Sequence, residues 1–525
     1  MQFRVASGLA LTAVLTACVA STPPPNAPAD PAPRDEAAPD WAARAHSRLP
    51  ILEPCTRPNV EETLLCGELE VPEDRAKPAG RRLRLEVVVV PAQNVAPPSD
   101  AVFVFEGGPG GAVTQRAAGA VWSGPVRQRD IVLMNQRGTS GSNRLDCDLE
   151  TRGDSTPGRL AEMYPPAAVA ACAERLGATA DLSRYTSIDH ADDVEAARRW
   201  LGYEAFNLRG GSYGTRAMMV YALRYPQRAR TLFGIGVDSP LRSNLAERGE
   251  QAQRALEGLS ALCATRPGCV ALTPRLDRQL AELLARFDDG PRRFEIEDPG
   301  EAGRRLTLEV DGRWLSEQLR LNLYFAFTTQ ALPFAVHRAL RLDDWQPVLQ
   351  LAVLVERMFT SSLASGLALT VQCSEGMDFD HAAARAAGAT TLFGNYRLEQ
   401  QIQGCAAWPH VPVPPLGLTD PPSHPAPTVW LSGAFDPVTP PTYADDAARL
   451  FPNSRHLVLA EGQHGPFDLE NGWPCVHRIW GQLLDQGSVA ELDTTCAQDM
   501  RRPPFITGVA DFRAHVAEVL APMAG

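Results

Sequence analysis

The chain has 525 residues, more than the roughly 250 to 300 that one hydrophobic core organises, so we expect a main core with a further subdomain. Apolar residues make up 44% and charged residues 21%, and the mean hydropathy of -0.18 argues against a polytopic membrane protein. The net charge of -12 leaves no basic surface for phosphate groups, so we expect no nucleic-acid partner.

The N-terminus has the features of an export sequence. Residues 1–17 contain an apolar run, Val5–Val14, that is too short to span a bilayer and is typical of a signal peptide. The run ends in Leu15–Cys18, which resembles the bacterial lipobox, and this resemblance implies lipidation of the cysteine after cleavage. We interpret residues 18–50 as the lipidated Cys18 and a flexible Pro/Ala-rich tether. We therefore expect an exported bacterial lipoprotein, held at the membrane in the periplasm or at the outer membrane. An ordinary signal peptide with a chance cysteine is the alternative.

Ten cysteines remain besides Cys18, and an even number in an exported chain predicts disulfides. Their separations favour the pairs Cys55–Cys66, Cys147–Cys172, Cys263–Cys269, Cys373–Cys405 and Cys475–Cys496, although the sequence does not fix the connectivity. Neither a C-x-x-C pair nor an H-E-x-x-H motif is present. We therefore expect no metal site and no cofactor.

Short apolar runs bounded by turn residues predict strands along the chain. They are Leu83–Val90, Ala101–Phe105, Ile131–Met134, Ala205–Leu208, Thr231–Val237, Thr428–Leu431 and His456–Leu459. Helical patterns lie between them, as at Asp192–Leu201 and Tyr213–Tyr225. Most of the strands are continuously apolar, as a sheet covered on both faces requires. The pattern predicts an α/β fold with a mostly parallel sheet.

This alternation stops between Leu241 and Leu416. Helical patterns dominate there, at Glu247–Cys263, Pro274–Phe287, Trp314–Leu323 and Trp345–Met358. We therefore expect an inserted, mainly helical cap over residues 241–415. It would separate the N-terminal half of the core, residues 51–240, from the C-terminal half, residues 416–525.

The strongest motif is Gly210–Gly214, which reads G-x-S-x-G between a predicted strand and a predicted helix. A serine in such a sharp turn needs small neighbours, because a side chain beside it would clash with the adjacent strand or helix. The motif predicts an α/β-hydrolase fold with Ser212 as the nucleophile of a serine hydrolase. A glycine-rich turn with a buried serine is the alternative.

A serine nucleophile needs a base and an acid. His464 lies in the loop after the last predicted strand, where this fold places its base, whereas His456 lies inside that strand and His477 in the next helix. Asp436 follows an earlier strand and gives the chain order Ser, Asp, His of this fold. Asp238, one strand earlier, is the alternative acid; we favour Asp436 because two prolines rigidify its loop.

Two backbone N–H groups should hold the oxyanion of the tetrahedral intermediate. One is the amide of Tyr213, directly after the nucleophile. The other should come from the glycine-rich loop at 106–111, where Pro109 has no N–H to donate. We expect Gly108 to be this donor, with Gly107 as the alternative.

These segments together resemble the tripeptidyl aminopeptidase and prolyl aminopeptidase group of α/β-hydrolases. The resemblance rests on Gly107–Gly111, Gln136–Gly141, Gly210–Thr215 and the acid and histidine loops, and it extends from about Cys55 onward. The region after Cys405 is similar to the C-terminal part of secreted tripeptidyl-type members. One departure is Glu106, where members commonly have histidine or asparagine.

In this group, cap acids bind the α-ammonium group of the substrate. The resemblance assigns this anchor to Glu375, with Asp378 and Glu106 as alternatives and a solvated or helix-capping carboxylate as the other interpretation. Arg137 is expected to brace the loops around the site.

The resemblance favours a serine exopeptidase of the tripeptidyl or prolyl aminopeptidase type, acting through an acyl-enzyme on peptides with a free N-terminus. A carboxylesterase or lipase-like hydrolase would share every catalytic group and is the first alternative. The second is a catalytically silent envelope lipoprotein, which the intact Ser212, Asp436 and His464 argue against. The oligomeric state is not predicted.

Overall fold

A computed structural model describes residues 40–121, 124–147, 149, 162–361, 363–413, 423–466 and 468–520. Residues 41–525 form one compact unit. The predicted signal peptide, Cys18 and most of the predicted tether lie outside the described residues. The tether prediction reached too far, because Trp41–Arg48 form helix α1, which buries Ala42 and Ala45 and pairs Arg48 with Asp130 at 2.7 Å.

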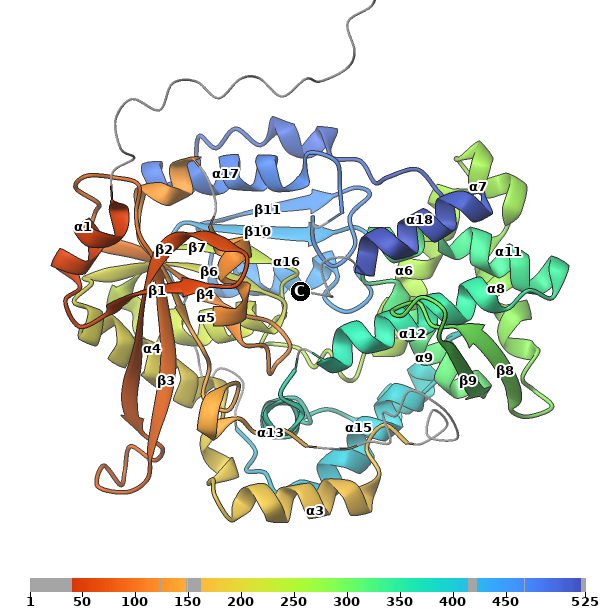
Figure 1. Cartoon of the computed structure of the whole chain (residues 1–525), viewed down its shortest axis with the longest axis horizontal. Coiled ribbons are helices and arrows are strands. Elements are labelled where there is room, and N and C mark those ends of the chain that lie inside the picture. The colour runs from red at the N-terminus through yellow and green to blue at the C-terminus, as the bar shows by residue number, and fades with distance from the viewer. Residues whose placement is uncertain are drawn as a thin grey trace, which may run out of the picture. The chain divides into compact units, whose positions relative to one another are not determined.

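Nine strands form one sheet in the order β1-β2-β3-β5-β4-β6-β7-β10-β11 (Figure 1). Neighbours run antiparallel from β1 to β5 in that order and parallel from β5 to β11. All seven predicted strands are present, and β1 and β2 are additional. The strands are β1 (Glu53–Arg57), β2 (Val60–Pro72), β3 (Arg82–Val90), β4 (Asp100–Phe105), β5 (Ile131–Met134), β6 (Ala205–Gly211), β7 (Ala229–Ile235), β10 (Thr428–Gly433) and β11 (Ser454–Leu459).

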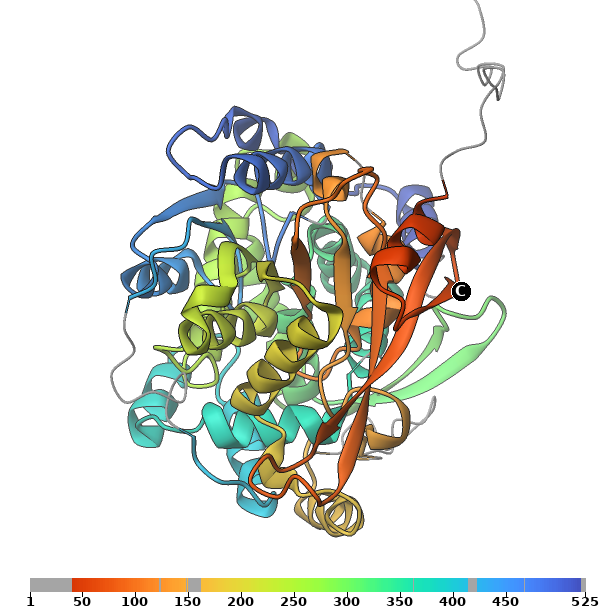
Figure 2. The same cartoon turned by 90° about the vertical axis from the view of Figure 1, so that its left-hand side faces the viewer.

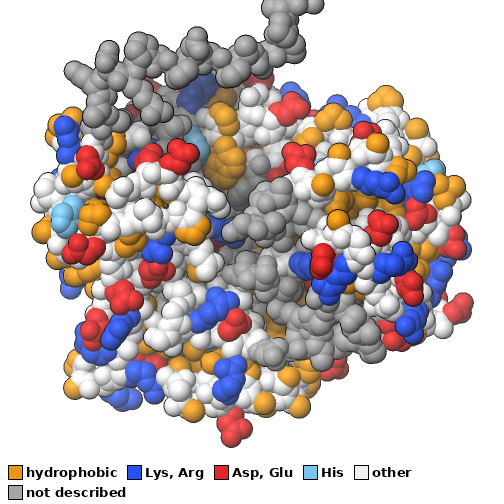
Figure 3. Space-filling view, in the orientation of Figure 1, with side chains coloured by type: hydrophobic (Ala, Val, Ile, Leu, Met, Phe, Trp, Pro, Cys, Tyr) orange, Lys and Arg blue, Asp and Glu red, His pale blue; other side chains and the backbone are white. Residues whose placement is uncertain are grey.

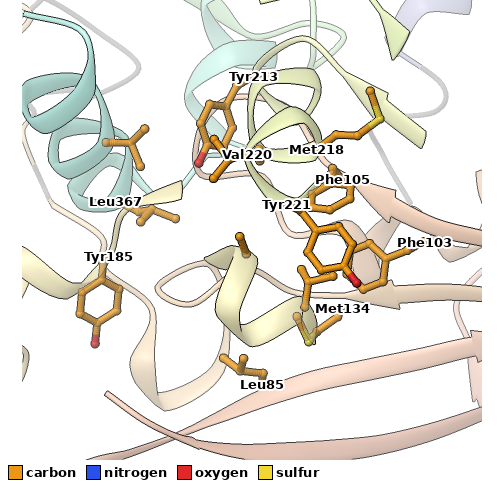
Figure 4. Close-up of a cluster of buried hydrophobic side chains, with 14 of the residues drawn as sticks. Leu85, Phe103, Phe105, Met134, Tyr185, Tyr213, Met218, Val220, Tyr221 and Leu367 are labelled. Carbon is orange, nitrogen blue, oxygen red and sulfur yellow. The ribbon is translucent and has the colours of Figure 1, made fainter. Parts of the chain in front are cut away.

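Helices bury both faces of this sheet (Figures 1 and 2). One face packs against α4 (Ser187–Leu201), α5 (Tyr213–Arg224) and α16 (Pro441–Leu450), in a hydrophobic cluster that α3 (Pro166–Gly177) also joins, and the other packs against α2 (Ala117–Ala120) and α17 (Gly472–Gln486). Figure 4 shows part of the first cluster, in which the ring of Phe105 lies 4.9 Å from that of Phe103 and 6.2 Å from that of Tyr221. Burial on both sides explains the continuously apolar strands, and the predicted α/β class is confirmed.

A second group of helices follows β7 and surrounds its own hydrophobic cluster. The elements between β7 and β10 are α6 (Arg248–Cys263), α7 (Pro267–Leu272), α8 (Leu276–Ala285), β8 (Arg292–Glu297), β9 (Arg305–Val310), α9 (Gly312–Asn322), α10 (Ala326–Thr329), α11 (Leu332–Leu342), α12 (Gln346–Ser361), α13 (Ser365–Glu375), α14 (His381–Gly388) and α15 (Tyr396–Ala407). The antiparallel hairpin β8–β9 was not predicted.

The boundary between core and cap also differs from the predicted one. Helix α13 and Cys405 of α15 belong to the hydrophobic cluster of the sheet, although both fall within 241–415. The C-terminal helix α18 (Val509–Leu520) joins the cap cluster instead, where the ring of Phe512 lies 5.5 Å from that of Phe334. An apolar stripe shows that a helix face is buried but does not identify the surface that covers it.

Five disulfides join the five favoured cysteine pairs.

Basic and acidic side chains are interspersed over the face shown in Figure 3. Among the described helices, none combines the length and apolar character needed to cross a membrane.

Candidate active site

Ser212 occupies a strained turn between β6 and α5. Its φ of 55° and ψ of -130° are rarely adopted by residues other than glycine, and its N–H donates to the Ile235 carbonyl at 2.9 Å. A Cβ on Gly214 would lie 2.3 Å from the carbonyl oxygen of Phe105, and one on Gly210 would lie 2.7 Å from that of Gly214. Both outer glycines of the motif are therefore required by the close approach of backbone segments.

His464 and Asp436 meet at the ends of the last two strands. The Nδ1 atom of His464 lies 2.8 Å from Oδ2 of Asp436, and both side chains are buried. The other oxygen, Oδ1, accepts the backbone N–H groups of Val438 and Thr439 at 2.9 and 2.8 Å. A carboxylate only accepts hydrogen bonds, so Nδ1 carries the proton and Nε2 is left as an acceptor.

The alternative acid, Asp238, has different partners. It accepts from Arg216 at 3.2 Å and from Asn244 at 2.9 Å. Only Asp436 of the two acids forms a hydrogen bond with His464 among the described residues. The geometry therefore favours Asp436 as the orienting acid.

The glycine-rich loop after β4 lies against the serine. A Cβ on Gly107 would lie 3.2 Å from that of Ser212, and Gly108 adopts a φ of 121° that favours glycine. Tyr213 is the first residue of α5, so its N–H is one of the helix donors without an acceptor inside the helix. Tyr213 directly follows the nucleophile, Gly107 approaches it, and Gly108 lines the same cavity, so the second donor remains a prediction.

Hydrogen bonds join the loop that carries His464 to the cap. The His464 N–H donates to the Tyr324 carbonyl at 3.0 Å, and the two rings are 5.1 Å apart. Further along this loop, Asp468 accepts the backbone N–H groups of Ala326 at 3.0 Å and Phe327 at 3.4 Å. Burial raises the pKa of Asp468 to about 6.

A cavity of about 1150 Å³ lies over these residues. Ser212, His464 and Gly108 line it, together with residues of α9, α12, α13 and α15. A space of this size holds a ligand of several residues.

Glu375 ends α13 and lines the same cavity. Its two carboxylate oxygens accept the N–H of Ser187 at 2.6 Å and the Ser187 hydroxyl at 2.8 Å. Ser187 is the first residue of α4, and its hydroxyl also lies 2.8 Å from the phenol oxygen of Tyr213. Burial raises the pKa of Glu375, and positive Arg216 opposes this shift.

The two alternative anchors are placed differently. Asp378 is exposed and does not line the cavity. Glu106 does line the cavity, where it interacts electrostatically with Arg209. Of the three acids, Glu375 alone is joined to the residue after the nucleophile through the contacts described.

The described residues contain no group of three or more side chains that could hold a metal ion.

Residues 100–284 match the family model described as alpha/beta hydrolase fold, which agrees with the sheet order and the turn at Ser212. The chain has the α/β-hydrolase fold. Residues 390–496 match a second model, described as TAP-like protein.

Curated relatives of the chain include two peptidases. Tripeptidyl aminopeptidase of Streptomyces lividans is 29% identical over 206 residues, or 36% of this chain and 38% of the relative. Serine protease Hip1 of Mycobacterium tuberculosis is 27% identical over 238 residues, or 41% of this chain and 45% of the relative. The chain thus spans less than half the length of these relatives. Among solved structures, an esterase from Thermogutta terrifontis has a TM-score of 0.32 and 15% identity, covering 81% of this chain and 100% of that chain.

Two residues of the site were not predicted. The Thr439 hydroxyl lies 2.8 Å from Oδ2 of Asp436 and 3.1 Å from Nδ1 of His464, and Ser187 binds Glu375. Neither belongs to a motif, so only their position in the fold reveals them. Arg137 does not line the cavity; it forms two hydrogen bonds of 2.7 and 2.8 Å to Asp193 of α4 and donates to the carbonyls of Glu73 and Arg184.

Proposed function

We propose that this α/β-hydrolase is a serine exopeptidase that removes a short peptide or a single residue from a free N-terminus. One observation carries the proposal: the Glu375 carboxylate faces the cavity of Ser212 and is held by contacts that lead back to Tyr213. A carboxylate at a fixed position binds the substrate's α-ammonium and sets how many residues reach the serine. The two peptidase relatives support the same reaction class.

In the proposed reaction, Ser212 Oγ attacks the scissile carbonyl and passes its proton to Nε2 of His464. Asp436 holds the imidazole in the required tautomer and stabilises the imidazolium. The amides of Tyr213 and Gly108 hold the oxyanion. The C–N bond then breaks as His464 gives the proton to the leaving amine. Water, activated by the same histidine, attacks the acyl-enzyme and releases the acyl fragment.

The anchor is preorganised for an ammonium group. Ser187 fixes both oxygens of Glu375, and each oxygen retains capacity to accept a further hydrogen bond. The N-terminus of α4 and Arg216 favour the ionised carboxylate against the cost of burial. The substrate's ammonium would add a charge-assisted hydrogen bond inside a partly buried cavity, where such bonds are strong.

The test compares chromogenic amides of one to three residues with free and acetylated amino ends, together with an ester of the same acyl group. We expect cleavage only of the free-amine amides, and Glu375→Gln should raise KM for them by about tenfold or more. Asp378→Asn is the matched control because Asp378 is exposed. Equal cleavage of acetylated amides would refute the anchor. Hydrolysis of the ester alone would identify the protein as a carboxylesterase. If a folded sample does not react with a fluorophosphonate, the protein is catalytically silent.

We also propose that the chain is exported and anchored in the cell envelope through lipid on Cys18. The lipobox-like Leu15–Cys18 segment supports this proposal. Labelled palmitate should enter the wild-type protein, and Cys18→Ser should lose the label and move to the soluble envelope fraction. Membrane association that is unchanged in Cys18→Ser would contradict the anchor.

A further inference from the structure

Three arginines gather on the cap side of the cavity around one carboxylate. Arg248 begins α6, Arg320 lies on α9 and Arg397 lies on α15, and all three line the cavity of Ser212. Glu317, one turn before Arg320, accepts two hydrogen bonds from it at 2.7 and 2.8 Å. Glu317 therefore faces three guanidinium groups, and the described residues form no ion pair with Arg248 or Arg397.

The cluster also has unused donors. Nη1 of Arg320, Nε of Arg248 and Nε of Arg397 are buried and have no hydrogen-bond partner in the described part of the chain. The side chain of Arg320 is only 2% exposed. Burial, assisted by the positive charges of Arg397 and Arg320, lowers the pKa of Arg248 to about 10. Buried donors without partners cost free energy, which a bound anion would recover.

The cluster lies within reach of the reacting atoms. A single ring separates Arg320 from His464: the guanidinium carbon lies 5.8 Å from the centre of the Tyr324 ring, and that ring lies 5.1 Å from the imidazole. The guanidinium is therefore within about 11 Å of the imidazole, the length of about three extended residues.

The cluster also adjoins the proposed amine anchor. A Cβ on Gly376, the residue after Glu375, would lie 2.9 Å from the side chain of Leu245, which lies in the turn just before α6 and Arg248. Arg248 therefore follows closely in the chain a residue that packs beside the end of α13, where Glu375 would bind the amino group of a substrate.

We propose that Arg248, Arg320 and Arg397 form a subsite for a carboxylate on the amino-terminal part of the substrate, namely an aspartate or glutamate side chain within the first three residues. This inference rests on the proposed exopeptidase function and specifies its substrate class. A carboxylate there would accept the unused N–H donors and compensate part of the excess positive charge. A neutral side chain of the same shape would leave those donors unpaired.

The experiment compares free-amine tripeptide amides that carry glutamate or glutamine at each of the three positions. At one position we expect kcat/KM to favour glutamate by about tenfold or more. Arg248→Gln and Arg397→Gln should each reduce that ratio several-fold. Arg341→Gln, which removes an arginine that is 53% exposed on α11, should leave the ratio unchanged. A second measurement follows protection of Ser212 from fluorophosphonate labelling by the matching tripeptides with free carboxylate ends.

The possible results separate the two proposals. Ser212-dependent cleavage of all the amides with no preference for glutamate at any position would overturn the subsite and leave the exopeptidase function standing. If no amide is cleaved, the exopeptidase proposal is wrong, and the protection of Ser212 from fluorophosphonate labelling then tests the subsite. Stronger protection by a glutamate peptide than by its glutamine counterpart, reduced in Arg248→Gln, supports the subsite; equal protection overturns it.

Discussion

Asp436→Asn tests the orientation of the base most directly. The oxygen Oδ1 accepts two backbone N–H groups, from Val438 and Thr439. We expect an asparagine at this position to keep its carbonyl oxygen in the place of Oδ1. The reverse orientation would put the NH2 group against the two backbone N–H donors and lose two hydrogen bonds of about 1 kcal/mol each. The NH2 group then faces Nδ1 of His464 and forces that nitrogen to accept.

The proton of the imidazole would consequently move to Nε2, the atom that must accept the proton of Ser212. We expect kcat to fall by about 10⁴-fold, or about 5.5 kcal/mol in activation free energy, with little change in KM. The assay is hydrolysis of the best free-amine amide, with the rate of fluorophosphonate labelling of Ser212 as a second readout. Thermal unfolding should show that the variant is folded.

Asp238→Asn provides the comparison. Its carboxylate pairs with Arg216 and Asn244, so the imidazole keeps its partner and the loss of kcat should be at least about 100-fold smaller. The reasoning is refuted if Asp436→Asn retains more than a tenth of the wild-type kcat, or if Asp238→Asn is the more damaging exchange.

Three further predictions concern stability. The raised pKa of Asp468 means that the folded state binds this proton more tightly than the unfolded chain does. The contribution of Asp468 to the free energy of unfolding therefore falls as pH rises from about 4 to 6. In denaturant unfolding, Asp468→Asn should gain up to about 3 kcal/mol of stability relative to wild type over that range. Gly214→Ala should cost several kcal/mol or prevent folding, measured as soluble yield and melting temperature, because its Cβ would meet the Phe105 carbonyl. Replacing both Cys373 and Cys405 by serine should cost about 4 kcal/mol, since their disulfide closes a separation of 32 residues, and should raise KM because Glu375 is two residues away.

Each stability prediction has its own control. Parallel pH curves for wild type and Asp468→Asn would show that this carboxyl does not govern the pH dependence. Gly177→Ala, at a helical position where a Cβ meets nothing within 4 Å, should be neutral or slightly stabilising, and a normal Gly214→Ala protein would contradict the close approach. Loss of the Cys263–Cys269 bridge, with a separation of 6 residues, should cost only about 2 kcal/mol; an equal cost for both pairs would count against the loop-closure argument.

Local patterns determined much of this protein. The seven strands could be predicted because each is buried on both faces and therefore continuously apolar. Ser212 and its flanking glycines could be predicted because a strained turn between a strand and a helix tolerates few residue types. His464 and Asp436 followed from their positions after the last two strands. All of these inferences depend on neighbours in the chain.

Tertiary structure decided what depends on distant contacts. Asp436 and Asp238 both follow strands, and only the folded arrangement places one of them beside His464. Ser187, Thr439 and the three cavity arginines belong to no motif, because their partners lie on other elements. Helices α13 and α18 likewise show apolar faces in sequence, yet only packing assigns α13 to the sheet and α18 to the cap. A periodic pattern specifies that a face is buried, whereas the identity of its partner is a property of the whole fold.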